Sequence, residues 1–434
     1  MVKAGLGSIR ATAVAACVTF ALASCAGAPA SDTAATTPTA AAPSPSASPV
    51  NTIDPGNFQD VITKAADALG VPGALVLLQT PQGTFTAKVG TTEIGTQTPP
   101  EPDTHFRIAS NTKTMTGALT VLLVQDGKLA FDDPISKFVP GVPGGDAITI
   151  ADLLKMRSGL YCYTNAPEFS EQLDADWNRA WAPQDVLDIA FAHPPNATPD
   201  AEYEYCNTNF ALLGMVAEKV GGRPLREQFA DRLFKPLGMD GTLLPAVDDT
   251  SIPPPFSHGY MYGPSKYAMV DEEYPADLTA AARDGSLKPI DYTNQTASYA
   301  TAAGGAISTA ADLATWMRAL VTGKVFDADY QKQWLDSVQA EDPDNPDGQK
   351  YGYGISYQRF SPHAAMYYHG GELPGFNSFM GFDPDNDVAL VIWTNLTLSP
   401  EGKTTAQALL PTALDQVYAG LNLTSPAPTT TTTR

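Results

Sequence analysis

The chain has 434 residues, and 43% of them are hydrophobic, which is enough apolar material for one large domain or two moderate ones. Its formal net charge is −21 at pH 7. Phosphate recognition needs a basic face, so this charge excludes a nucleic-acid partner. The charge carries no information about the fold.

The first residues have the layout of a targeting segment. Lys3 and Arg10 give a positive start, and residues 11–23 are small and apolar. The apolar run is too short to span a bilayer as a permanent helix. This layout is typical of a secretory signal peptide over residues 1–24.

Residues 22–25 read Leu-Ala-Ser-Cys, which resembles the lipobox of bacterial lipoproteins. The resemblance implies cleavage before Cys25 and a lipid on its thiol. It also implies an extracytoplasmic protein that is anchored to the bacterial cell membrane through that lipid. The alternative is an ordinary signal peptide followed by an incidental cysteine.

Two segments are of low complexity. Residues 25–52 are mostly Ala, Thr, Pro and Ser, and the tail over residues 423–434 is rich in Thr and Pro. Both hold too little large apolar surface to offset the entropy of ordering, so both are predicted to be disordered. No repeat or linker interrupts residues 53–422, which predicts a single domain there.

The domain begins with a predicted helix, two strands and a second helix. Apolar residues at helical spacing predict a helix over residues 57–69. The apolar run 73–79 predicts a buried strand, and a Pro-Gln-Gly turn connects it to a second strand at 84–89. A helix with an apolar stripe is predicted over residues 110–126, where a glycine stops it.

Helices fill the middle of the chain, and strands return near its end. Further helices are predicted over residues 150–156, 183–192, 209–220, 225–233 and 310–320. Two late strands, 375–383 and 388–394, precede a final helix over 405–421. Residues 245–298 are predicted to be a long loop or an elaborated insertion. We therefore expect an α/β fold of the α+β type. It has one antiparallel sheet built from N- and C-terminal strands, flanked by helices, with a mostly helical insertion.

The strongest chemical signal is Ser110 followed by Lys113, at the start of an apolar helix. This spacing places both side chains on one helix face. A serine hydroxyl needs a neighbouring base to become a nucleophile, and a lysine can be that base if burial lowers its pKa. The alternative is that Ser110 is only the N-cap of the helix. The chain contains no other Ser-x-x-Lys.

Two further motifs follow. Tyr205-Cys206-Asn207 leads into an apolar helix, and His369-Gly370-Gly371 precedes a strand. Tyr-x-Asn alone is ambiguous, because it also occurs at Tyr163 and Tyr292. The order Ser-x-x-Lys, Tyr-x-Asn, His-x-Gly resembles that of class C β-lactamases and serine D-alanyl-D-alanine carboxypeptidases, a family similar to penicillin-binding proteins. The resemblance covers roughly residues 55–420 and implies a β-lactamase/transpeptidase-like fold.

The resemblance also implies roles for individual residues. Ser110 would attack a carbonyl carbon, while Lys113 and Tyr205 share the proton transfers in an order that stays open. Asn207 would hydrogen-bond the substrate amide or stabilise Lys113. The backbone N–H groups of Ser110 and Glu372 would form the oxyanion hole.

The His-Gly-Gly segment is expected to bind substrate. Gly370 and Gly371 would let a substrate lie against the strand edge. His369 takes the position where the family has a cation, but an unperturbed histidine is charged only in mild acid. If His369 attracts a substrate carboxylate by charge, preference for a free C-terminal carboxylate weakens above its pKa. A neutral ring could still donate one hydrogen bond, and a purely structural histidine is the alternative.

Cys162 and Cys206 remain once Cys17 leaves with the signal peptide and Cys25 is lipidated. Cys206 lies inside the Tyr-x-Asn motif, and Cys162 follows a Ser-Gly-Leu-Tyr segment that lies near the site in the family. In an oxidising compartment this favours a Cys162–Cys206 disulfide. Two buried free thiols are the alternative.

Other chemistries find little support in the sequence. No Gly-x-Ser-x-Gly elbow and no phosphate-binding glycine loop is present. The other histidines lack metal-ligand spacing, so we expect no metal and no cofactor. These histidines are His105, His193, His258 and His363.

The motifs therefore predict a serine hydrolase that works through an acyl-enzyme, as a D-alanyl-D-alanine carboxypeptidase or β-lactamase-like enzyme of the cell envelope. Its partners would be peptidoglycan stem peptides, β-lactams or small esters and amides, and a monomer is favoured. One alternative is a small-molecule esterase or D-amino-acid amidase of the same fold. Another is a catalytically weak penicillin- or peptidoglycan-binding lipoprotein. Intact Ser110, Lys113 and Tyr205 argue for activity.

Overall fold

The computed structural model describes residues 50–270 and 272–424. The predicted signal peptide over residues 1–24 and the lipidation site Cys25 lie outside the described residues, as do most of the predicted linker and the tail from residue 425. Residues 50–52, which the sequence assigns to the linker, pack on the described body. Val50 is buried and pairs with Tyr418, and the Asn51 N–H donates to Val417 O at 2.8 Å.

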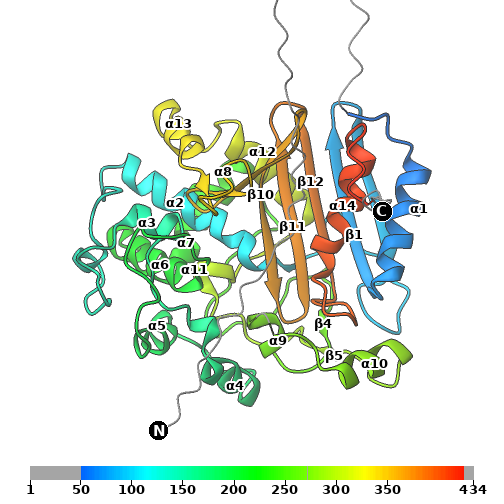
Figure 1. Ribbon diagram of the computed structural model, residues 1–434, viewed down its shortest axis with the longest axis horizontal. Coiled ribbons are helices and arrows are strands. Elements are labelled where there is room, and N and C mark those ends of the chain that lie inside the picture. Colours follow the sequence, from blue (N-terminus) through cyan, green and yellow to red (C-terminus); the bar gives the residue numbers. More distant parts are fainter. Residues whose placement is uncertain (1–49, 271, 425–434) are drawn as a thin grey trace, which may run out of the picture. The chain divides into compact units, whose positions relative to one another are not determined.

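The core of the fold is one antiparallel sheet of eight strands in the order β2-β1-β12-β11-β10-β9-β8-β7 (Figure 1). Its strands are β1 Gly73–Thr80, β2 Gly83–Gly90, β7 Gln339–Ala340, β8 Lys350–Tyr351, β9 Ser356–Ser361, β10 Ala364–Leu373, β11 Phe376–Asp383 and β12 Val388–Thr394. The first strand pairs with the last, with Ala74 opposite Thr394. The predicted fold class, a sheet made from both ends of the domain, is confirmed.

The alternation of side chains along β1 explains why both faces of the sheet are covered. Leu75 and Leu77 point into the larger apolar core, on the side of the helical region. Val76 and Leu78 point into a smaller core on the opposite face. There the helices α1 (Pro55–Ala68) and α14 (Thr405–Val417) cover the sheet, as the blue and red ribbons of Figure 1 show.

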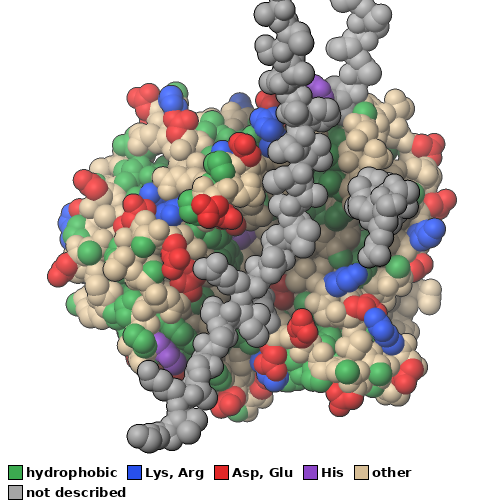
Figure 2. Space-filling model, viewed as in Figure 1, with side chains coloured by type: hydrophobic (Ala, Val, Ile, Leu, Met, Phe, Trp, Pro, Cys, Tyr) green, Lys and Arg blue, Asp and Glu red, His purple; other side chains and the backbone are tan. Residues whose placement is uncertain are grey.

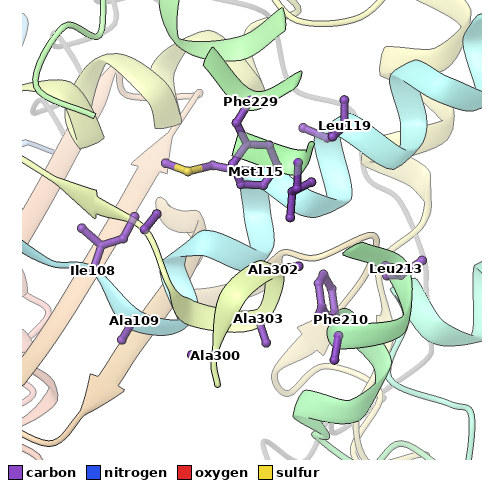
Figure 3. Packing of buried hydrophobic residues seen from close by; sticks show 14 of the residues in the cluster. Ile108, Ala109, Met115, Leu119, Phe210, Leu213, Phe229, Ala300, Ala302 and Ala303 are labelled. Atoms are coloured by element: carbon purple, nitrogen blue, oxygen red, sulfur yellow. The ribbon is translucent and has the colours of Figure 1, made fainter. Parts of the chain in front are cut away.

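Most of the remaining helices pack in the larger core, whereas α10 (Ala276–Asp284) packs in a small separate cluster with Tyr260, Tyr262 and Leu396. The others are α2 Thr112–Gln125, α3 Ile150–Leu154, α4 Pro167–Ala175, α5 Pro183–Phe191, α6 Asn207–Gly221, α7 Leu225–Phe229, α8 Lys235–Leu237, α9 Lys266–Met269, α11 Thr301–Gly304, α12 Ala310–Val321 and α13 Ala328–Asp336. Every residue of α2 from Thr112 to Val124 is buried. In Figure 3, Met115 and Leu119 of α2 lie beside Phe229 of α7, and α11 runs past Phe210 of α6. The helix that follows Ser110 is thus enclosed on all sides.

The insertion over residues 245–298 contains more regular structure than the sequence predicted. Besides α9 and α10, it holds a short pairing of β4 (Tyr260–Met261) with β5 (Ile290–Asp291). Another short pairing joins β3 (Phe106–Arg107) to β6 (Ile307–Ser308). Acidic side chains are spread over the face shown in Figure 2. Within the described ranges, no helix has the length and apolar character that crossing a bilayer requires.

Candidate active site

Ser110 lies in a one-turn 3-10 helix, Ala109–Asn111, immediately before α2. Ala109 has φ of 51°, a left-handed conformation that costs a non-glycine residue roughly 1 kcal/mol. The side chain of Asn111 fixes this turn, because its Nδ2 donates to Ile108 O at 3.0 Å and to Ser378 Oγ at 2.8 Å. The N-cap position of α2 belongs to Asn111, so the N-cap alternative for Ser110 is wrong.

Lys113 is completely buried in the first turn of α2, three residues after Ser110. Its Nζ contacts three oxygen atoms: Ser110 Oγ at 2.9 Å, Asn207 Oδ1 at 2.7 Å and Ala303 O at 2.7 Å. Burial lowers the pKa of the Lys113 ammonium from its ordinary value of 10.5 to about 7. At neutral pH, a large fraction of this amine is therefore unprotonated and able to accept the proton of Ser110.

Tyr205 lies in the loop before α6 and closes the other side of Ser110. Its hydroxyl hydrogen-bonds Ser110, and Lys113 Nζ lies 4.9 Å from the centre of its ring. The residue keeps 38% of its surface exposed, but the hydroxyl end against Ser110 is buried. That burial raises the pKa of the Tyr205 phenol, so the group keeps its proton at neutral pH.

Asn207 is the first residue of α6, and it uses both ends of its side-chain amide. Its Oδ1 accepts from Lys113, and its Nδ2 donates to Thr164 Oγ1 at 3.1 Å. Sequence reasoning missed Thr164, although it is the middle residue of the rejected motif Tyr163-Thr164-Asn165. The second rejected motif lies elsewhere, since the hydroxyl of Tyr292 donates to Gly263 O.

The strand β10 lies directly against the serine turn. A side chain at position 371 would put its Cβ 2.2 Å from Ile108 O, so only glycine allows this approach. Glu372 follows and is half-buried. The predicted site residues Ser110, Gly370, Gly371 and Glu372 therefore lie along one wall of the same cleft.

His369 lies inside β10 and does not behave as a charged group. Its Nε2 is 3.1 Å from the hydroxyl of Tyr351, and its Nδ1 is 2.7 Å from Gly370 O. Burial, with the nearby charge of Lys113, lowers the pKa of His369 to about 3. The ring is therefore neutral even in mild acid, where the sequence allowed a charge that attracts a substrate carboxylate, and both ring nitrogens have partners within the protein. This favours the structural alternative.

The predicted Cys162–Cys206 disulfide is absent, since both cysteines are buried free thiols. The two thiols hydrogen-bond each other. The Asn207 N–H donates to Cys162 Sγ at 3.0 Å, and Cys206 Sγ donates to Leu160 O at 3.5 Å. The sequence correctly paired the two cysteines in space but not their chemical state. Burial raises the pKa of Cys162, but the hydrogen bonds from Cys206, Thr164 and Asn207 outweigh it and lower that pKa, whereas burial raises the pKa of Cys206.

Two cavities meet at Ser110. The larger, of about 460 Å³, has a wall of aromatic side chains that includes Tyr203, Tyr205 and Tyr368. The smaller, of about 40 Å³, is lined by Thr164 and Asn207 among others. Glu372 borders both, and among the described residues that line either cavity there is no Lys or Arg. A substrate carbonyl at Ser110 can thus carry a large group on one side and a small one on the other.

Comparison with known proteins agrees with this geometry. The β-lactamase family model matches residues 58–414. The fold is similar to that of a D-stereospecific amidohydrolase from a Streptomyces species, with 29% identity, a TM-score of 0.70, and coverage of 83% of this chain and 99% of that one. It is also similar to a D-amino acid amidase from Ochrobactrum anthropi, with 26% identity, a TM-score of 0.70, and coverage of 84% and 98%.

A curated relative, protein flp of Staphylococcus aureus, is 31% identical over 178 residues, which are 40% of this chain. The match spans about a third, 34%, of the length of flp. The family model, in contrast, covers nearly the whole described body, including the turn of Ser110, the start of α6 and the strand β10. This chain therefore belongs to the β-lactamase family and is a serine hydrolase of that fold.

Proposed function

We propose that the protein is an amidohydrolase that forms an acyl-enzyme on Ser110 and acts on amides or short peptides of D-amino acids with a free amino group. The observation that carries the proposal is the Ser110, Lys113 and Tyr205 cluster, in which a buried amine with a pKa of about 7 lies 2.9 Å from the serine hydroxyl. A base whose pKa is near the working pH is well suited to proton transfer.

Acylation follows from these contacts. The unprotonated amine of Lys113 accepts the proton of Ser110 Oγ as the oxygen attacks the carbonyl carbon of the substrate. The backbone N–H groups of Ser110 and Glu372 stabilise the negative charge that develops on the carbonyl oxygen. Hydrogen bonds to Asn207 and Ala303 hold Lys113 in line with the hydroxyl throughout.

The leaving nitrogen must be protonated before the C–N bond breaks. Tyr205 is suited to this step, because its raised pKa keeps it protonated and its hydroxyl contacts Ser110. The phenol gives its proton to the leaving amine and regains one from the Lys113 ammonium. Water then hydrolyses the ester on Ser110, with Lys113 as the base for the second time.

The charges in the cleft favour a substrate with an amino group. A peptidase that recognises a C-terminal carboxylate needs a cation, yet His369 is neutral and the described lining holds no Lys or Arg. The negative charge of Glu372 acts within the cleft, since it helps to raise the pKa of Tyr205. The field of that charge would favour a substrate ammonium in the cleft. The names of the Streptomyces and Ochrobactrum proteins, which match over nearly their full length, suggest D-configured amides.

A kinetic comparison of substrate classes tests the proposal. D-phenylalanine amide, its L enantiomer, N-acetyl-D-alanyl-D-alanine and benzylpenicillin would be compared by kcat/KM. We expect the D-amide to react fastest, and Ser110→Ala to lose at least about a thousandfold. Ser286→Ala is the control, because this serine is exposed and lies outside the site. Faster cleavage of the acetylated dipeptide would instead establish a carboxypeptidase, and rapid turnover of penicillin a β-lactamase.

We also propose that the enzyme works outside the cytoplasm, tethered to the membrane by a lipid on Cys25. The support is the signal-like N-terminus with its lipobox-like end. The chain between Cys25 and the described body would then set the distance between the active site and the membrane.

A further inference from the structure

A third cavity, of about 390 Å³, lies apart from the two cavities at Ser110. The sides are formed by α6, the start of α7, the loop of residues 244–249 and the segment of residues 297–305. It shares no lining residue with the two cavities at Ser110. Its volume is within the range of natural small-molecule sites.

Arg107, on β3, lines this cavity and is only 3% exposed. Both hydrogen bonds of its guanidinium come from Nη2, to Thr250 O at 2.7 Å and Thr293 O at 3.4 Å. Its Nε has no hydrogen-bond partner among the described residues. No salt bridge joins the group to a described carboxylate, although the charge of Asp249 acts on it from farther away and favours its charged form. Burying a cation with an unused hydrogen-bond donor costs folding free energy unless an anion pairs with it.

Apart from Arg107, the cavity has an apolar wall and charged residues at its rim. Ala211, Met215 and Leu225 supply apolar wall. Four exposed charged residues also border the cavity: the acids Glu218, Asp248 and Asp249, and the cation Arg226. Glu218 and Asp249 already accept backbone N–H groups, of Leu225 at 2.8 Å and Ser251 at 2.9 Å. Solvent screens the acids at the rim, whereas the buried Arg107 is screened much less.

We propose that this cavity binds a small organic acid, with its carboxylate on the Arg107 guanidinium and its apolar body along α6. A carboxylate matches the guanidinium donors and would bind through Nη1, which takes no part in the hydrogen bonds to Thr250 O and Thr293 O. Burial lowers the pKa of Arg107 only to about 10, so the guanidinium stays charged at neutral pH. The apolar walls contribute affinity in proportion to the length of the ligand's hydrocarbon part.

Only a thin segment, residues 301–304, separates the proposed binding cavity from the catalytic cleft. Ala302 lines the cavity, and its carbonyl accepts from Thr116 Oγ1 of α2 at 2.6 Å. The next residue, Ala303, offers its carbonyl to Lys113 on the catalytic side. The helix α6 touches this segment closely, since a Cβ at Gly214 would lie 2.6 Å from the Cβ of Ala302. The proposed ligand would thus rest on the back of the segment that holds the catalytic amine.

Calorimetric titration with hexanoate, acetate and hexylammonium tests the proposal on the purified protein. We expect saturable 1:1 binding of hexanoate, at least tenfold weaker binding of acetate, and no measurable binding of hexylammonium. Arg107→Gln should weaken hexanoate binding at least tenfold. Ala246→Trp fills the mouth of the cavity, leaves Arg107 intact and should have the same effect. Ile94→Trp, at a position 48% exposed and remote from the cavity, is the matched control and should bind as the parent does.

Two comparisons separate this site from the active site. Ser110→Ala should bind hexanoate with unchanged affinity, so the result does not depend on whether the proposed amidohydrolase activity is correct. Equal hexanoate affinity in Ala246→Trp and Ile94→Trp would overturn the proposal. Tighter binding of hexylammonium than of hexanoate would overturn it as well, because the rim acids would then govern binding. Absence of any saturable hexanoate binding has the same consequence.

Discussion

At the scale of single residues, the site depends on one amine that the fold keeps out of water. Lys113 is surrounded by oxygen acceptors, but no carboxylate is among its three hydrogen-bond partners. Desolvation therefore governs its ionisation, and its pKa falls to about 7. The same side chain on a surface helix would stay charged and could not act as a base.

The pH dependence of kcat/KM should follow this group. Because the base works only without its proton, we expect the rate to rise about tenfold per pH unit in acid and to level off above a pKa near 7. Values of kcat/KM measured from pH 5 to 9 with an uncharged amide substrate would show this rise and the pH at which it levels off. A profile that stays level below pH 7 contradicts the assignment of Lys113 as the base.

Removing the amine should stabilise the fold while it destroys activity. Between pH 7 and 10.5 the unfolded chain binds a proton at Lys113 that the folded chain lacks, so its contribution to the unfolding free energy rises with pH in that window. Lys113→Met abolishes the cost of the buried charge, which is largest below pH 7. We expect a gain on the order of 1–3 kcal/mol in urea unfolding at pH 6, and less at pH 10. Equal gains at both pH values would contradict the buried-charge explanation.

His369 should act as a structural residue. Since its ring is neutral far below pH 5, the ratio of kcat/KM for amide and carboxylate-terminated substrates should not change between pH 5 and 8 through this residue. His369→Leu leaves the buried Tyr351 hydroxyl without its partner and should lower the unfolding free energy by about 1–3 kcal/mol. The exposed His363→Leu is the control, for which no comparable loss is expected.

The sequence predicted which residues gather at the site, but not their ionisation. The order of the motifs was enough to predict that four residues lie in one site, because the family fold places these motifs together. The four are Ser110, Lys113, Tyr205 and Asn207. The charge of His369 depends on how deeply the ring is buried and on Tyr351, which a motif does not contain. The thiol state of Cys162 and Cys206 likewise depends on hydrogen bonds from neighbouring loops.

At the scale of elements, the contact between β10 and the serine turn decides the shape of the cleft. Gly371→Ala would force its Cβ against Ile108 O, a backbone atom that cannot rotate away. We expect a loss of about 1–3 kcal/mol in stability and a fall in kcat as Ser110 is displaced. For stability, Gly370→Ala is the matched control, because its Cβ would come close only to the flexible end of Gln407, at 2.8 Å, while Ser378 O lies at an ordinary contact distance of 3.7 Å. Similar losses in both variants would show that the close approach at position 371 is not the cause.

Periodicity predicted the elements with a continuous apolar pattern and failed for those without one. The helices α1 and α12 and the strands β1 and β12 were found within a few residues, because their apolar patterns are continuous. The strand β10 was missed, since its run of Tyr, His and Gly has no apolar alternation and is stabilised by its neighbours β9 and β11. For the same reason the insertion was underestimated, because α9, α10 and the β4–β5 pairing depend on tertiary contacts.

At the scale of the whole molecule, the sheet joins the two ends of the folded body. The first strand pairs with the last, and Val50 pairs with Tyr418 beyond them. The role of the N-terminal segment as a tether stays a prediction from the sequence. The described residues do not include that segment.

The tether can be tested by its cysteine. In a bacterial host, Cys25→Ser should move the protein from the membrane fraction to the soluble fraction and abolish labelling with radioactive palmitate. Cys17→Ser is the control, because Cys17 would be removed with the signal peptide and its loss should change neither result. Membrane retention of the Cys25→Ser protein would argue against lipid anchoring at this residue.

The short helix α11 has a consequence for how this enzyme can diversify. Its residues Thr301 and Ala302 face the Arg107 cavity, while Ala303 and Gly304 face the serine. A substitution that remodels one compartment displaces peptide groups that belong to the other. Substitutions in α11 therefore affect both compartments at once. Variants of α11 that reshape the Arg107 cavity should also change kcat for the reaction at Ser110.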